Sequence, residues 1–439
     1  MTTTDTTLVR DPRAPGERSA PGSHMSSFSS QRVHAATFWL AAVAFLLNMA
    51  FSAVPTPLYV LFQQRDHFSD LMITVVYAVY AVGVIASLFL WGHLSDWHGR
   101  RRLLVPALLA NVVSAVIFVS APSLAGLMVA RVISGVAVGL SIATATSYLA
   151  ELHGRARPDA SGRRAQVVAT SANLGGIGLG PLAAGLLAQF APWPMRLSFI
   201  VFGAALLVLA GGIALSPETV RRPDLMPPYR VQRVSVPAHS KRLFRAATGA
   251  AMASFAVLGV FNSLVPSFLL GSLHESSHAL AGAVAFAAFA ASAVAQIVTP
   301  RTPTSKLLGW GVPIVALGLA LLTGGMWNAD LVMFVFGGIL TGGGAGLVFK
   351  GAVSAIYRIA PLESRAETLA GFFLGAYVGL SIPVVGLGVA TTYWSERNVM
   401  LVFVLITAAA IALSARSVLR GMARLDAPAP DPVVQDQAA

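Results

Sequence analysis

The sequence predicts an all-α integral membrane protein with twelve transmembrane helices, arranged as two pseudo-symmetric six-helix bundles. Composition, the number of long apolar segments and a repeat between the two halves support this prediction. The chain has 439 residues, of which 56% are hydrophobic and only 11% charged, and its mean hydropathy is +0.72. A soluble domain carries about a quarter charged residues, so this much apolar surface requires a bilayer around it.

The apolar segments are long enough to cross a membrane. A helix needs about 20 apolar residues to span a hydrocarbon core of about 30 Å, and most of the segments are rich in Gly and Ala, which allow close helix packing in lipid. The expected transmembrane helices span residues 37–62, 71–91, 103–121, 124–148, 166–190, 197–215, 243–270, 279–298, 307–327, 331–356, 368–391 and 399–416.

Hydrophilic segments divide the chain into domains. Residues 1–34 are rich in Thr, Ser, Pro and Arg without apolar periodicity, so we expect a disordered tail rather than a signal peptide. A proline- and arginine-rich linker at 217–242 separates an N-terminal bundle, 35–216, from a C-terminal bundle, 243–418. Residues 419–439 are expected to form a second tail.

The basic residues predict which side of the membrane each loop occupies, because cytoplasmic loops carry an excess of Lys and Arg. Of 30 such residues, only Arg65, Arg196 and Arg397 fall in loops of one side. Arg131 and Lys350 fall within helices, and all the others lie in the tails and loops of the other side. Both termini are therefore expected in the cytoplasm, and the net charge of +12 indicates membrane topology rather than a nucleic acid partner.

The two halves resemble each other at three places in the same order. This repetition predicts a duplicated six-helix unit, which is an architecture of transporters that bind their solute near the middle of the membrane. The matched pairs are residues 52–55 with 263–266, 135–140 with 342–347, and 178–181 with 380–383.

The loop between the second and third helices carries the most specific motif. Residues 92–102 read GHLSDWHGRRR and resemble the G-x-L-(A/S)-D-x-x-G-R-R/K signature of the major facilitator superfamily. The resemblance implies that fold, transport by alternating access, and a latch in which Asp96 meets the start of the eleventh helix in the outward-facing state. The matching loop at 299–306 lacks the Asp and the glycines, so any latch is expected to be asymmetric. The latch residues would be Gly92, Asp96, Gly99, Arg100 and Arg101.

The fifth helix carries a second motif. Residues 176–185, GIGLGPLAAG, resemble the G-x-x-x-G-P-x-x-G-G antiporter motif of exporters in the superfamily, with Ala184 in place of one glycine. Proline removes a backbone hydrogen bond, so this helix is expected to bend and slide; the alternative is close packing alone. This is the one feature that favours export over import, and its residues are Gly176, Gly180, Pro181 and Gly185. Residues 216–219, SPET, resemble the exit sequence that closes the sixth helix and are interpreted as structural.

Two cations fall within predicted helices, where a charge costs several kcal/mol unless it is paired or hydrated. Arg131 precedes Gly135 by four residues, as in a second family motif, so a functional role is expected; the alternative is snorkelling to the outer interface. Lys350 lies about 9 Å from the middle of its helix and either lines the cavity or snorkels inward. If both face the cavity, they favour anionic or neutral, partly aromatic solutes.

Acidic residues and histidines all fall in tails, loops or helix ends. The first helix lacks the acid that many drug/proton antiporters of the superfamily carry. Glu151 and Glu367 are therefore the candidates for proton coupling, with cytoplasmic ion pairs as the alternative. The chain has no Cys, which excludes disulfides and thiolate metal sites, and no metal or cofactor is expected.

Polar side chains within the helices are candidates to hydrogen-bond a solute in an apolar cavity, and each is equally able to bridge two helices. The candidates are Asn48, Tyr59, Tyr80, Asn173, Asn262 and Tyr377, followed by Tyr77, Asn111, Ser263 and Gln296.

The resemblance implies a monomeric secondary transporter in the bilayer of a bacterial inner membrane, which exports a small drug or metabolite in exchange for protons. The first alternative is a proton-coupled importer of a sugar or organic acid. An integral-membrane enzyme is disfavoured, because the sequence offers no intramembrane nucleophile, metal cluster or carboxylate pair.

Overall fold

The protein is described here from a computed structural model. It describes residues 22–92, 94–220, 229–232, 234–237, 240–361 and 364–426, with side chains for all of these except 22–30 and 366. These residues form helices and no β-strand. Twelve helices are long and apolar enough to cross a membrane, so the predicted multi-pass helical fold is confirmed.

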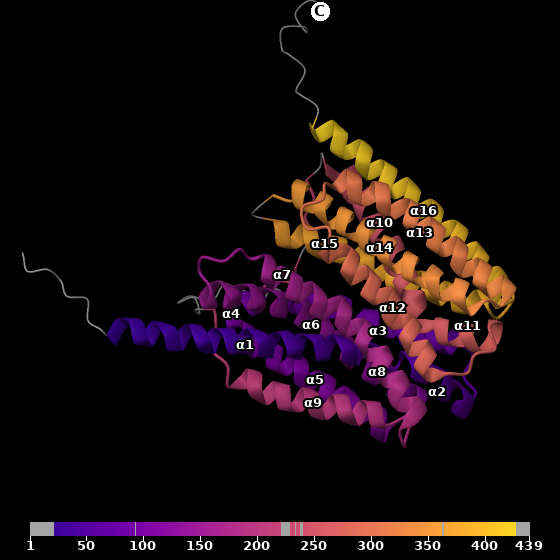
Figure 1. The fold of residues 1–439 in the computed structure, drawn as a ribbon, viewed down its shortest axis with the longest axis horizontal. Coiled ribbons are helices and arrows are strands. Elements are labelled where there is room, and N and C mark those ends of the chain that lie inside the picture. The colour runs from indigo at the N-terminus through magenta and orange to yellow at the C-terminus, as the bar shows by residue number, and fades with distance from the viewer. Residues whose placement is uncertain are drawn as a thin grey trace, which may run out of the picture.

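The helices form two bundles that lie one above the other in Figure 1. The N-terminal bundle comprises α1 (Gly22–Ala53), η1 (Thr56–Leu58), α2 (Tyr59–Asp66), α3 (Asp70–Trp91), α4 (Ser95–His98), α5 (Arg100–Ser120), α6 (Leu124–Ala156), α7 (Arg163–Thr170), η2 (Ser171–Gly175), α8 (Gly176–Phe190) and α9 (Leu197–Ala214). The C-terminal bundle comprises α10 (Lys241–Ser263), α11 (Val265–Ser272), α12 (His278–Ile297), α13 (Thr304–Asn328), α14 (Leu331–Ile359), α15 (Arg365–Ala390) and α16 (Glu396–Asp426).

The outermost helices are longer than the sequence predicts. Helix α1 begins at Gly22, so the expectation of a disordered tail is wrong for residues 22–34; once a helix is nucleated, each added residue gains a hydrogen bond. Helix α16 continues to Asp426, whose carboxylate pairs with Arg358 Nη2 at 2.6 Å, so residues 419–426 are helical rather than tail. Residues 1–21 and 427–439 lie outside the described residues.

The first and seventh membrane spans are each broken at a proline. Helix α1 ends just before Pro55, and α10 ends just before α11, which has Pro266 as its second residue. Proline cannot donate to the preceding turn, so both spans are interrupted where the repeated sequence places the proline. The two breaks touch across the bundles, because Thr56 Oγ1 donates to the backbone oxygen of Asn262 at 3.1 Å.

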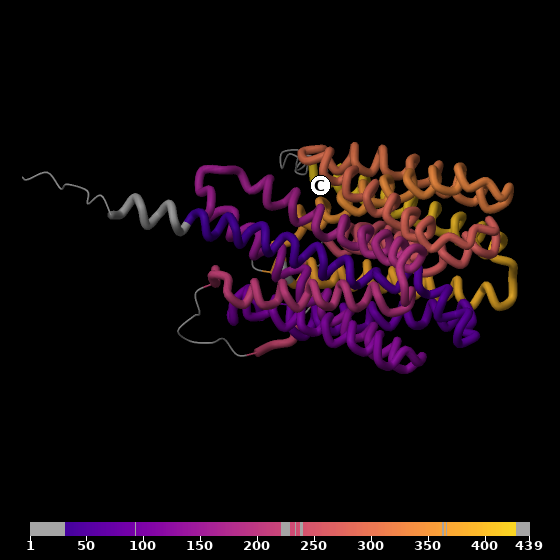
Figure 2. The backbone as a smooth tube through the Cα atoms, turned by 60° about the horizontal axis from the view of Figure 1, so that its bottom comes forward, coloured from indigo at the N-terminus to yellow at the C-terminus, as the bar shows by residue number. Residues whose placement is uncertain are grey.

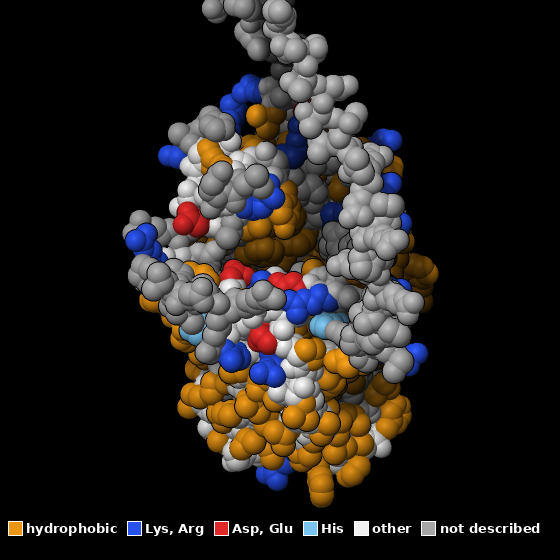
Figure 3. Space-filling model, turned by 90° about the vertical axis from the view of Figure 1, so that its left-hand side faces the viewer, with side chains coloured by type: hydrophobic (Ala, Val, Ile, Leu, Met, Phe, Trp, Pro, Cys, Tyr) orange, Lys and Arg blue, Asp and Glu red, His pale blue; other side chains and the backbone are white. Residues whose placement is uncertain are grey.

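The bundles are closed at one end and open at the other. Both ends of the described chain lie on the same side, because twelve spans cross the membrane an even number of times; we call this side the terminal end (Figure 2). At the opposite end, His278 N–H donates to Gln189 Oε1 at 3.0 Å, and Gly388 packs against Thr74. Figure 3 shows the terminal end, where a hollow between the bundles is lined by hydrophobic side chains and has charged residues on its rim.

The linker crosses between the bundles at the terminal end. The Gln232 N–H donates to the Phe89 carbonyl at 3.1 Å, near the end of α3. Three residues later, the Ser235 carbonyl accepts from Thr368 Oγ1 of α15 at 2.7 Å, and Val234 packs at Gly371. The described linker residues therefore connect α3 to α15 on the side where the hollow opens.

Glycines at helix crossings set the distance between helices, which gives a direct test of the packing. A Cβ on Gly135 of α6 would lie 2.1 Å from the Tyr80 carbonyl oxygen of α3, so Gly135→Leu is expected to lower stability by about 1–3 kcal/mol through overpacking. The thermal unfolding midpoint of the protein in detergent measures this loss. Gly211→Leu is the matched control, because no atom lies within 4 Å of its Cβ position. Equal loss in the two variants would contradict the packing described.

Candidate functional site

The loop between α3 and α5 contains one position, Gly99, that only glycine can occupy without strain. Gly99 has a φ of +108°, a conformation that side chains disfavour. A Cβ at this position would also lie 2.3 Å from Oε2 of Glu218. Both the backbone conformation and the neighbour therefore require glycine, as the motif in residues 92–102 indicates.

Arg100 is the centre of an ion-pair network at the terminal end. Its side chain contacts Asp96 Oδ1 at 2.5 Å and Glu151 Oε1 at 3.0 Å. Its backbone N–H, at the start of α5, donates to Glu218 Oε1 at 2.9 Å. A carboxylate at this position satisfies an end N–H of the helix and complements its dipole. Three acids, from α4, α6 and the segment after α9, thus converge on one residue.

The segment after α9 docks into the same network. Thr219 Oγ1 donates to Glu151, Arg101 Nη1 donates to the Ser216 carbonyl at 2.9 Å, and Tyr148 Oη donates to the Pro217 carbonyl at 2.6 Å. Arg101 therefore supplies donors for carbonyls left free at the end of α9. The sequence identified residues 216–219 as structural but missed the capping role of Glu218, whose partners are distant in the chain.

The predicted latch residues are assembled within one bundle. The Asp96 side chain is 59% exposed and pairs with Arg100 of the same bundle. Gly92 closes α3, and the Gln232 side chain of the linker lies 3.4 Å from its Cβ position. In this conformation the linker, through Ser235, contacts the first turns of α15, the region that the family resemblance assigns to Asp96.

Arg131 is buried rather than snorkelled, with 2% of its surface exposed. Its Nη1 donates to the Ser52 carbonyl at 2.5 Å, which lies in the last turn of α1. Its guanidinium stacks over the Tyr80 ring at 4.5 Å from the ring centroid and over the Tyr77 ring at 5.6 Å. The cation therefore caps a broken helix, where free carbonyls and the negative end of the helix dipole attract it.

Lys350 caps another helix in the same way. Its Nζ donates to the Gln296 carbonyl at 2.6 Å and to both the carbonyl and the hydroxyl of Thr299. These oxygens lie at the end of α12, toward the terminal end, so Lys350 follows the snorkelling alternative. In this conformation the ammonium is held by helix-end oxygens rather than presented to a solute.

The polar candidates divide into two groups. Asn48 bridges helices: its Nδ2 donates to Ser141 Oγ at 2.8 Å, and its Oδ1 accepts from Asn111 Nδ2 at 2.8 Å. Asn262 and Tyr77 lie at the junction of the bundles, where the Asn262 backbone oxygen accepts from Thr56 Oγ1 and Tyr77 lies close to the Asn262 side chain. Tyr377 approaches Tyr77 and Tyr80 from the other bundle. Asn173 lies in η2.

An aromatic cluster extends from Tyr377 into the C-terminal bundle, and the sequence analysis did not identify it. The Phe255 ring lies 5.6 Å from that of Tyr377 and 5.1 Å from that of Phe349, and Phe349 in turn lies 6.3 Å from Phe373. The rings of Phe255, Phe349 and Phe373 are partly exposed. These residues come from α10, α14 and α15, and no sequence motif joins them.

The fifth span combines a π-helical turn, η2, with the glycine-rich α8. Gly180 lies against α1, where a Cβ would be 2.0 Å from the Ala50 oxygen. Gly185 lies against α12, with the His278 oxygen 2.3 Å from its Cβ position, and Gly282 of α12 packs on the Pro181 oxygen in return. Gly176 similarly packs on Leu46. The motif therefore forms a backbone-to-backbone contact with both bundles.

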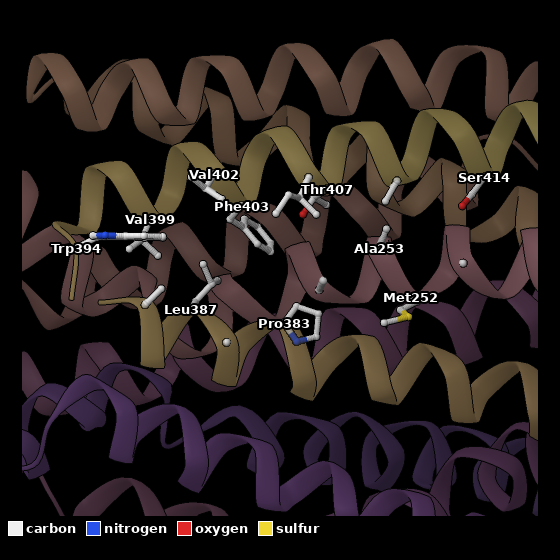
Figure 4. A pocket seen from close by; sticks show the side chains of 16 residues that line it. Met252, Ala253, Pro383, Leu387, Trp394, Val399, Val402, Phe403, Thr407 and Ser414 are labelled. Atoms are coloured by element: carbon white, nitrogen blue, oxygen red, sulfur yellow. The ribbon is translucent and has the colours of Figure 1, made fainter. Parts of the chain in front are cut away.

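A separate apolar pocket of about 440 Å³ lies between α10, α15 and α16 (Figure 4). Pro383 and Trp394 line it, and the nearby Ile382, Leu405 and Ile406 side chains are exposed. Gly379 packs directly on the Met252 backbone, which closes the seam between α10 and α15. The pocket therefore belongs to the lipid-facing surface.

Glu218 provides a test of the network. Glu218→Ala leaves the backbone N–H groups of Arg100 and Thr219 without their acceptor and is expected to cost about 1–3 kcal/mol. The thermal unfolding midpoint measures the loss, which Glu218→Gln should largely restore. Asp159→Ala, an exposed acid in the loop before α7, is the control. Unchanged stability in Glu218→Ala would refute the capping role.

Comparison with known protein families, sequences and solved structures agrees with the twelve-helix fold. The chain matches the family model of the Major Facilitator Superfamily over residues 40–314. The multidrug resistance protein MdtM of Salmonella typhimurium is 27% identical over 296 residues, covering 65% of this chain and 70% of that protein. The glucose transporter GlcP of Staphylococcus epidermidis is 30% identical over 151 residues, covering 34% of this chain and 32% of that protein. The solved structure of the nucleoside transporter NupG covers 87% of this chain and 98% of its own, with a TM-score of 0.66 and 14% identity.

Proposed function

Because the chain belongs to the major facilitator superfamily of membrane transporters, we propose that it exports a small organic solute, neutral or anionic, in exchange for protons. The two bundles rock about a site between them, so that one side closes as the other opens. With both termini in the cytoplasm, as the Lys and Arg distribution indicates, the hollow at the terminal end opens inward. The structure then corresponds to the conformation that takes up solute from the cell.

The fifth span is the observation that carries the assignment to export. Gly185 and Gly282 bring the backbones of α8 and α12 together across the two bundles without intervening side chains, so this contact between bundles is a smooth surface able to slide. Residues 176–185 resemble the exporter motif, with Ala184 in place of one glycine, and MdtM, a relative over 65% of the chain, is a multidrug resistance protein. Import of a sugar is the second candidate, because GlcP resembles about a third of the chain.

The proposed class of solute follows from the side chains that line the hollow between the bundles. The hollow is lined by hydrophobic side chains, and the partly exposed rings of Phe255, Phe349 and Phe373 offer stacking surfaces. Among the described residues, carboxylates lie at helix ends or in connections, so an organic cation finds no countercharge at mid-depth. A neutral or anionic compound with an aromatic part fits this lining.

Proton coupling is assigned to Glu151 and Glu367. Glu151 accepts from Arg100 and Thr219, so its protonation would weaken its ion pair with Arg100 and change the charge balance of the network that also holds Asp96. Glu367 lies in the first turn of α15, the helix that the latch would contact. Both acids lie at the terminal end and are thus accessible from the cytoplasm, where an exporter releases its protons.

Direction and coupling are tested together in proteoliposomes with an imposed pH gradient. An antiporter is expected to move solute against its gradient when protons flow the opposite way, and an uncoupler is expected to abolish that movement. The measurement is the flux of radiolabelled or fluorescent compounds from a drug and metabolite panel. Glu151→Gln and Glu367→Gln should lower the proton-driven flux while leaving exchange of solute for solute.

Three results would separate the alternatives. Accumulation of sugar with protons moving in the same direction would establish import. Flux that the uncoupler does not change would remove the proton assignment. Normal proton-driven flux in both Gln variants would remove Glu151 and Glu367 as carriers but leave export intact.

Asp96 is the residue whose change should affect cycling without affecting folding. Asp96→Asn removes the charge of an exposed side chain, so we expect transport to fall about tenfold or more while expression and membrane insertion stay near normal. A tenfold fall corresponds to about 1.4 kcal/mol of lost latch energy. Asp159→Asn, another exposed acid at the terminal end, should transport normally. Undiminished flux in Asp96→Asn would remove the latch assignment.

A further inference from the structure

Arg131 is a buried cation whose charge is only partly compensated. Among the described residues, its side chain has no ion pair with Asp or Glu. The Ser52 carbonyl and the rings of Tyr77 and Tyr80 stabilise it, but each of these supplies a partial charge. A buried charge without a full countercharge is costly.

Two hydrogen-bond donors at this point also lack acceptors. Nε of Arg131 and the hydroxyl of Tyr59 are both buried, and neither makes a hydrogen bond of normal geometry to a described residue. The two side chains lie within hydrogen-bonding reach of each other, and only 3% of Tyr59 is exposed. Buried donors are rarely left unsatisfied, and an unpaired group often indicates a water or an ion.

The chemistry of the site favours an anion over a water. A water can satisfy both donors, but it leaves the charge of the guanidinium uncompensated. An anion only accepts hydrogen bonds, and it also neutralises the guanidinium. The remaining unpaired group on the same face of α6, the Ser134 hydroxyl, is a further donor one turn away.

We propose that Arg131 and Tyr59 bind a small monovalent anion, a halide or a carboxylate group, at the break in the first span. The site lies between α1, α2, α3 and α6 and belongs to the N-terminal bundle alone. The position that matches Arg131 in the repeat is Gly338, where the Phe261 ring occupies the space. The proposal does not depend on the direction of transport, because it concerns binding to one bundle.

The test compares anions at constant ionic strength on purified protein. The thermal unfolding midpoint is measured in chloride, bromide and acetate, with the bulkier isethionate as reference. We expect a saturable rise with at least one small anion, because a ligand that binds only the folded state stabilises it. Tyr59→Phe should weaken the apparent affinity by about tenfold or more, because the variant loses one hydrogen bond to a charged group.

Arg131→Gln should abolish the rise, and Lys350→Gln is the matched control, because the Lys350 ammonium already has oxygen partners at the end of α12.

Anomalous scattering from bromide in crystals of the unaltered protein gives an independent readout and should show a peak between Nε of Arg131 and the Tyr59 hydroxyl. A response to halides identifies an inorganic ion, and a response to acetate alone identifies the carboxylate of an organic ligand. No response to any anion, an equal response in Arg131→Gln, or a bromide peak only elsewhere would overturn the proposal.

Discussion

Every helix end near or within the bilayer needs partners for its free backbone groups, because lipid supplies none. In this protein charged side chains meet that need repeatedly. Arg131 caps the end of α1, Lys350 the end of α12 and Arg101 the end of α9, while Glu218 caps the start of α5. The charges of the membrane region are thus tied to places where spans break or end.

The duplicated halves satisfy this requirement differently. Both contain a span broken at a proline, but only the N-terminal half places an arginine beside its break; the C-terminal half has Gly338 and the Phe261 ring there. The ion-pair network around Arg100 also belongs to the N-terminal half, whereas the aromatic cluster of Phe255, Phe349 and Phe373 belongs to the C-terminal half. The charged network and the aromatic cluster therefore belong to different halves of the repeat.

The sequence is sufficient for features that depend on local pattern. The length of the apolar segments predicts the twelve spans, and the repeated prolines fall at the breaks of both halves. The motif in residues 92–102 indicates that the backbone at position 99 requires glycine. The sequence is insufficient where the partner is distant in the chain. Glu218 meets Arg100 across 118 positions, and Arg131 meets Ser52 across 79, so neither pairing leaves a local signal. Helix beginnings such as Gly22 fail for another reason, because continuation from a long helix outweighs weak local preference.

The linker between the bundles has an energetic consequence. Among its described residues, Tyr229 and Gln232 donate to the carbonyls of Leu90 and Phe89 at the end of α3, and Ser235 accepts from Thr368 of α15, next to the packing of Val234 on Gly371. Each neutral hydrogen bond contributes about 0.5–1.5 kcal/mol. Because 1.4 kcal/mol changes a population ratio tenfold, the loss of even one such bond shifts the balance between the two orientations by up to about an order of magnitude. Substitutions among these few residues would therefore change the fraction of time that the transporter is open to one side of the membrane, without altering its binding surfaces.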